Sequence, residues 1–229
     1  MSSLIRNSKD YPSKRPSDKH AFVLCGFGGS IWQLKRLISV LNRDGYNVRA
    51  LDFSEDVLSK GDPELLPALT HEVVTLAEAR QRELNRPVLL VGVSLGALMS
   101  VNVLRRSKLY DTAVLITGGD IVKVAQRLYG PKVWPQAYDE LASIWQDVNM
   151  YTEPALLRGK HALMVLPTRD KLIDPEDVRA EVEKQQAAGN DLQLLERGNF
   201  GHLGTIVEEA VLFPKRTQGY VRRVAHPAG

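Results

Sequence analysis

Apolar and polar positions follow two different rhythms along the chain. From residue 21 onward, short apolar runs are separated by longer segments in which apolar residues recur every three or four positions. Short runs indicate buried strands and the longer period indicates helices, so the alternation predicts βα units around a mostly parallel sheet. Six runs are the predicted strands: Ala21–Cys25, Val48–Leu51, Val88–Val91, Ala113–Ile116, Ala162–Leu166 and Leu192–Leu195.

The segments between these runs carry apolar residues along one face, as amphipathic helices do. Pro175 opens a further helix, and the last helix is expected to stop at Pro214 because proline interrupts a helix interior. The apolar faces of the other predicted helices fall within residues 34–41, 66–77, 98–104 and 203–211. Helices between parallel strands cover both faces of the sheet, so the predicted class is α/β with helices on both sides.

One domain accounts for most of the 229 residues, since a chain of this length forms a single large core. Residues 1–20 are polar and without periodicity and are expected to be an N-terminal tail or a loose edge element. The predicted domain spans residues 21–215, followed by a C-terminal tail at 216–229. The segment at residues 118–158 is too long for a simple crossover between two strands, so it predicts an insertion.

Composition and charge limit the classes of partner and cofactor that are expected. A formal net charge of +3 gives no reason to propose a nucleic-acid partner, and no apolar run reaches membrane-spanning length, so no stable membrane insertion is expected. The single cysteine, Cys25, excludes an internal disulfide and favours a cytoplasmic location. No pair of histidines or cysteines has metal-ligand spacing, and no metal or other cofactor is predicted. The oligomeric state is left open.

A candidate nucleophile lies directly after the third predicted strand. Gly92-Val93-Ser94-Leu95-Gly96 joins that strand to a helical segment, which is the setting that a G-x-S-x-G nucleophile elbow requires. Small residues are needed on both sides of the serine because the turn is sharp and side chains there would collide with neighbouring backbone. Ser94 is therefore the predicted nucleophile.

A serine hydroxyl is a weak nucleophile that needs a base, and the base needs a third group to orient it. His202 follows the last predicted strand and precedes the last helix. Asp170 follows the strand Ala162–Leu166, so both residues are expected at the same edge of the sheet as Ser94. Asp174 and Asp120 are the alternatives for the acid, although Asp174 before Pro175 is also typical of a helix N-cap.

In these motifs the chain resembles the α/β-hydrolase superfamily, and in particular its serine esterases and lipases. The order Ser, Asp, His along the chain is the order of that superfamily. The resemblance extends over residues 21 to about 215. It implies an α/β-hydrolase fold. The insertion at 118–158 leaves from the carboxyl end of the strand Ala113–Ile116, where Ser94 is also expected, so we predict that it is a small cap over Ser94.

The turn Cys25-Gly26-Phe27-Gly28-Gly29-Ser30 stands where members of the superfamily often carry His-Gly-x-x-Gly. By resemblance, the backbone amides of Phe27 and Leu95 would form the oxyanion hole. Cys25 replaces the usual histidine, which affects the bracing of the turn more than its backbone donors. The same glycines could begin a dinucleotide fingerprint with Asp52 as the ribose-binding acid, but Ile31 stands where that fingerprint needs a third small residue.

The expected function is hydrolysis of a carboxylic ester or thioester through an acyl-enzyme on Ser94, as in a carboxylesterase or lipase, with a small-molecule acyl substrate. An acyltransferase, a peptidase with the same triad and a catalytically silent binding protein of this fold remain the alternatives. The aromatic residues of the insertion, in particular Trp134 and Trp145, are expected to form an apolar wall for the acyl group or else to pack the insertion onto the body.

Overall fold

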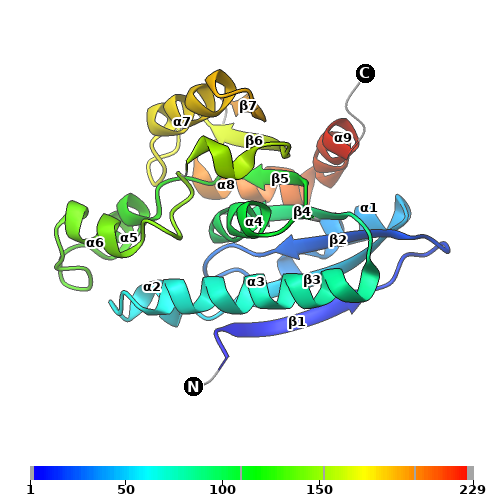
Figure 1. Ribbon diagram of the computed structural model, residues 1–229, viewed down its shortest axis with the longest axis horizontal. Helices are drawn as coiled ribbons and strands as arrows, with labels where there is room; N and C mark the ends of the chain where they lie inside the picture. Colours follow the sequence, from blue (N-terminus) through cyan, green and yellow to red (C-terminus); the bar gives the residue numbers. More distant parts are fainter. Residues whose placement is uncertain (1–2, 109, 152, 199, 226–229) are drawn as a thin grey trace.

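A seven-stranded sheet lies at the centre of the computed structural model, which describes residues 3–108, 110–151, 153–198 and 200–225 (Figure 1). The strand order is β1-β3-β2-β4-β5-β6-β7. All neighbouring pairs from β3 to β7 are parallel, and only β1 is antiparallel to its neighbour. The strands are β1 Ile5–Tyr11, β2 Lys19–Leu24, β3 Tyr46–Phe53, β4 Val88–Val93, β5 Thr112–Ile116, β6 His161–Pro167 and β7 Asp191–Arg197.

The six predicted strands correspond to β2 through β7, so the predicted α/β class with a mostly parallel sheet is confirmed. The central strand β4 is buried along its whole length, which explains why it reads as a continuous apolar run rather than an alternating one.

Helices cover both faces of this sheet. On one face α3 and α4 pack against each other, and on the other face α1 packs against α9 (Figure 1). The helical segments are η1 Ile31–Leu34, α1 Lys35–Arg43, α2 Asp56–Ser59, α3 Leu65–Leu84, α4 Leu95–Arg106, α5 Ile121–Tyr129, α6 Tyr138–Ile144, η2 Pro154–Leu157, α7 Pro175–Ala187, α8 His202–Ile206, the π-helix η3 Val207–Leu212 and α9 Pro214–Ala225.

Of the two expectations for residues 1–20, the structure differs from a tail and agrees with an edge element. Residues 5–11 form β1 at the edge of the sheet, and Leu4 is buried with its backbone N–H donating to the carboxylate of Glu72 at 3.0 Å. The strand is mostly exposed and polar, because an edge strand contributes backbone hydrogen bonds without burying its side chains. It therefore carries no apolar pattern that the sequence could reveal. Residues 1–2 lie outside the described part.

The C-terminal boundary also differs from the sequence expectation. The helix before Pro214 ends at Leu212, as expected, but it is not the last helix, because Pro214 begins α9, where proline fits the first turn. Val221 and Val224 of α9 are buried against α1 and β5, so residues 216–225 belong to the domain. Residues 226–229 of the expected tail lie outside the described part.

The insertion at 118–158 contains α5, α6 and η2, with α5 and α6 packed together at one end of the sheet (Figure 1). Among the described residues, no helix is both long enough and apolar enough to cross a membrane.

Candidate active site

Ser94 stands on a strained turn between β4 and α4. Its φ of 52° lies in the left-handed region that non-glycine residues rarely adopt. A side chain at Gly92 would place its Cβ 2.3 Å from the carbonyl oxygen of Gly96, and one at Gly96 would come within 2.0 Å of that of Leu24. The two glycines therefore let α4 pack directly against β2 and β4, which fixes the position of the serine.

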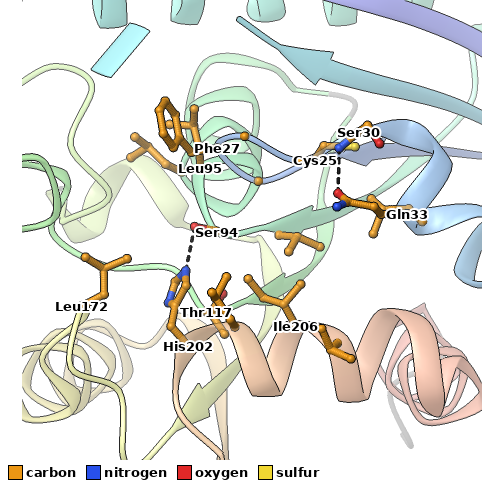
Figure 2. A pocket seen from close by; sticks show the side chains of 18 of the residues that line it. Cys25, Phe27, Ser30, Gln33, Ser94, Leu95, Thr117, Leu172, His202 and Ile206 are labelled. Atoms are coloured by element: carbon orange, nitrogen blue, oxygen red, sulfur yellow. Dashed lines mark hydrogen bonds between the residues drawn. The ribbon is translucent and has the colours of Figure 1, made fainter. Parts of the chain in front are cut away.

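His202 and Asp170 lie in line with this serine. His202 Nε2 is 3.0 Å from Ser94 Oγ (Figure 2), and His202 Nδ1 is 2.8 Å from Asp170 Oδ2. The Asp170 side chain is fully buried and that of His202 is 9% exposed. The structure thus brings together the three residues predicted from the sequence, although the segments that carry them follow three different strands.

The second oxygen of Asp170 is also held. Oδ1 accepts hydrogen bonds from the backbone N–H groups of Leu172 at 2.8 Å and Ile173 at 3.0 Å. These donors fix the carboxylate plane, so Oδ2 faces the imidazole. An ionised carboxylate in this position favours the tautomer with the proton on Nδ1, which leaves Nε2 free to accept from the serine hydroxyl.

The two alternative acids have other partners. Asp174 is the N-cap of α7 and accepts from Glu176 N–H at 3.1 Å. Asp120 caps α5 through Val122 N–H and also accepts from the hydroxyl of Tyr138 at 2.6 Å. Both therefore have structural roles in the described part of the chain.

The turn after β2 packs against the nucleophile. A Cβ on Gly26 would lie 3.2 Å from Ser94 Cβ, and Figure 2 shows Phe27 and Leu95 close to Ser94, on the side away from His202. Among the described residues, neither the Phe27 nor the Leu95 backbone N–H has a hydrogen-bond acceptor. Leu95 is the first residue of α4, where backbone N–H groups have no partner within the helix. Both amides are thus available to a negatively charged oxygen.

Asp52 holds this turn in place through hydrogen bonds, a role that the sequence analysis did not identify. Its buried carboxylate accepts from Ile31 N–H at 3.1 Å and from Arg6 Nε at 3.0 Å, while Arg6 also donates to the carbonyl of Gly29 at 2.7 Å. The position of Asp52 at a strand end was the available signal, but it suggested a ribose contact. In the structure, that carboxylate instead accepts hydrogen bonds from other residues of the chain.

Cys25 begins the same turn and is buried. Desolvation raises the pKa of its thiol to about 12, so the thiol stays protonated near neutral pH. It acts as a small apolar side chain at the floor of the site.

A cavity of about 910 Å³ opens over Ser94. Its walls are mostly apolar, which suits an acyl group better than a charged one. Helix α5 of the insertion contributes Ile121, Val124 and Leu128 to the wall. The ring of Phe27 also packs edge-on against that of Tyr129 on α5, with centroids 6.1 Å apart.

The expectation that Trp134 and Trp145 form this wall is corrected by the structure. Both side chains are fully buried, and they pack edge to face with centroids 5.0 Å apart, away from the cavity lining. Their indole N–H groups donate to the carbonyl oxygens of Leu58 and Pro63. The insertion is thus fastened to the body by its largest aromatics and faces the cavity with smaller aliphatic residues.

Trp145→Ala is therefore expected to lower the free energy of unfolding by about 3–5 kcal/mol, the usual cost of deleting a large buried aromatic side chain. It should leave the ratio of activities on short and long acyl chains unchanged. Chemical denaturation and a series of ester substrates measure the two effects. A changed chain-length preference without a loss of stability would restore Trp145 to the substrate wall.

Comparisons with known proteins support the same architecture. No protein-family model matches the chain, and no curated protein sequence matches it. Among solved structures, an esterase from Pyrococcus furiosus is 22% identical, with 91% of this chain and 82% of that chain covered and a TM-score of 0.65. TT1662 from Thermus thermophilus is 16% identical, with 93% of each chain covered and a TM-score of 0.70.

An acylaminoacyl peptidase from Pyrococcus horikoshii is 11% identical and has a TM-score of 0.73. The match covers 94% of this chain but 38% of the peptidase. At these identities the comparisons establish a shared fold.

Proposed function

The chain has the α/β-hydrolase fold, and from that premise we propose that it is a serine hydrolase that cleaves carboxylic esters through an acyl-enzyme on Ser94. The observation that carries the proposal is the aligned pair of contacts, 3.0 Å from Ser94 Oγ to His202 Nε2 and 2.8 Å from His202 Nδ1 to Asp170 Oδ2. This is the geometry in which an imidazole activates a serine.

In the first half-reaction Ser94 Oγ attacks the ester carbonyl carbon while His202 Nε2 takes the hydroxyl proton. The carbonyl oxygen gains negative charge and is stabilised by the backbone N–H groups of Phe27 and Leu95. The intermediate then collapses: the bond to the leaving alcohol breaks and His202 returns the proton to that alcohol. Asp170 stabilises the imidazolium that exists between these two transfers.

In the second half-reaction water attacks the acyl-enzyme. His202 takes a proton from the water, the oxyanion forms again in the same place, and the bond to Ser94 Oγ breaks as the proton passes to it. The products are a carboxylic acid, an alcohol and the free enzyme. The proposed mechanism uses only Ser94, His202, Asp170, the two backbone amides and water.

Hydrolysis of p-nitrophenyl esters and acyl thioesters of graded chain length tests the proposal. We expect measurable turnover of the esters and a preference for apolar acyl groups, because the cavity wall is apolar. Faster turnover of the thioesters would assign that class as the substrate. If the folded protein turned over neither class, the proposed activity would be wrong.

Val124→Phe is expected to shift the chain-length preference. Val124 lies on α5 and lines the cavity, so a larger side chain there fills space that a long acyl group needs. The ratio of kcat/KM for long to short acyl esters should fall about tenfold, the usual size of such discrimination in an apolar pocket. A proportional loss on all esters would instead place the acyl group elsewhere in the cavity.

A further inference from the structure

Large apolar side chains are exposed around the opening of the cavity. Trp32 is 71% exposed, Leu203 75% and Leu212 54%, and all three line the cavity. Phe213, which directly follows Leu212, is 48% exposed. Soluble proteins rarely gather exposed side chains of this size in one place unless the patch binds something.

These residues come from segments that pack together. Trp32 lies on η1, which continues into α1. Both η1 and α1 contact the π-helix η3, which ends at Leu212. Arg36 of α1 donates a hydrogen bond to the carbonyl oxygen of Val211 at 3.3 Å. Helix α9 packs on both α1 and η3, and α8, which carries Leu203, also packs on η3, so the exposed groups lie on neighbouring segments.

The same segments carry exposed cations. Lys35, Arg36 and Lys215 are exposed on η1-α1 and α9, and the first two line the cavity opening. The acidic residues of η3 do not offset them, because Glu208 and Glu209 are buried and paired with Arg216 and Arg197. Glu55, which lies near Gly28, brings one exposed negative charge to the turn before η1.

We propose that this surface, formed by Trp32, Leu203, Leu212 and Phe213 with the cations Lys35, Arg36 and Lys215, docks on an anionic lipid surface. We call it the mouth face. Exposed aromatic and aliphatic side chains bordered by lysine and arginine are the composition that binds a lipid interface, where the apolar groups enter the acyl boundary and the cations contact anionic headgroups.

A second copy of the chain fits this surface less well. A two-fold interface through the mouth face would bring the three cations of one copy close to those of the other. A lipid surface of opposite charge meets no such repulsion. Docking there would also open the cavity toward the lipid, so an ester could pass from the membrane to Ser94 without crossing water.

Cosedimentation with vesicles tests the proposal, using phosphatidylcholine alone and phosphatidylcholine containing phosphatidylglycerol. We expect the full chain to bind the anionic vesicles and to lose most of that binding at high salt or with neutral vesicles. Lys215→Glu and Phe213→Ser, neither of which touches the cavity lining, should each weaken binding to anionic vesicles about tenfold or more while hydrolysis of a soluble ester stays unchanged.

Matched controls lie near the amino ends of β5 and β6, at the end of the strands opposite Ser94. Lys108 is exposed after α4, and Leu156 is 47% exposed on η2 just before β6, so Lys108→Glu and Leu156→Ser change charge and apolar exposure away from the mouth face. Both should bind as the unsubstituted protein does. Ser94→Ala should also bind, which separates docking from catalysis.

Two results would overturn the proposal. One is equal binding, or no binding, to neutral and anionic vesicles by a chain that still hydrolyses soluble esters. The other is concentration-dependent dimerisation in sedimentation velocity that Phe213→Ser abolishes, since that result would assign the mouth face to a second copy.

Discussion

Asp170→Asn is expected to lower kcat for ester hydrolysis by about 10⁴-fold, the size of the effect of the same change in a serine-protease triad. The reason lies in the contacts of both carboxylate oxygens. Oδ1 accepts from Leu172 and Ile173 N–H, so an asparagine would keep its carbonyl oxygen there and turn its NH₂ group toward His202 Nδ1. The imidazole would then carry its proton on Nε2 and could no longer accept one from Ser94.

Asp174→Asn is the matched control, four residues along the same loop. Asparagine caps a helix as well as aspartate does, and the ion pair of Asp174 with Arg127 is long, at 3.7 Å, and partly exposed. We expect kcat within about twofold of the unsubstituted enzyme, as for surface changes away from a reacting group. Steady-state kinetics of both variants, with their melting temperatures, decide the assignment. A larger loss in Asp174→Asn would transfer the acid role to that residue.

Gly96→Ala is expected to destabilise the protein by about 3 kcal/mol or more, because the added Cβ would lie 2.0 Å from the backbone oxygen of Leu24. To remove this clash, α4 must move away from β2, and Ser94 and the Leu95 amide would move with it. Activity should therefore fall about 100-fold or more, the scale that displacement by about 1 Å produces at a reacting centre.

Gly219→Ala provides the comparison in the same chain. Gly219 lies in α9, and beyond the adjoining helix backbone nothing lies within 4 Å of an added Cβ. Alanine should therefore raise the free energy of unfolding by up to about 1 kcal/mol through its higher helix propensity. Urea denaturation measures both variants. An unchanged midpoint in Gly96→Ala would mean that α4 and β2 are not in the close contact described above.

The sequence predicted those parts of the fold that depend on burial. Strands β2 to β6 are mostly buried, and β7 keeps an apolar pattern around the buried Leu192. The elbow motif requires a strand before it and a helix after it, so pattern and motif indicate the same topology. The acid and the base could be chosen because parallel strands bring the loops at their carboxyl ends to one edge of the sheet.

The sequence could not predict features that depend on packing between distant segments. Strand β1 is held by backbone pairing with β3, which leaves no side-chain pattern. Trp134 and Trp145 are residue types that often line an apolar pocket. Their indole N–H groups instead donate to the carbonyl oxygens of Leu58 and Pro63, which are far away in the chain. Asp52 likewise gains its role only when Arg6 and Ile31 meet it in the folded chain.

The central claim is that Ser94 is an activated nucleophile, and covalent labelling by a fluorophosphonate tests it most directly. In that reaction Ser94 Oγ forms a bond to phosphorus and fluoride leaves, so intact-mass spectrometry reads the outcome as one added phosphonyl group. The account predicts one adduct on the unsubstituted protein and none on Ser94→Ala of equal melting temperature. An adduct that persists on Ser94→Ala, or a folded unsubstituted protein that never acquires one, would contradict it.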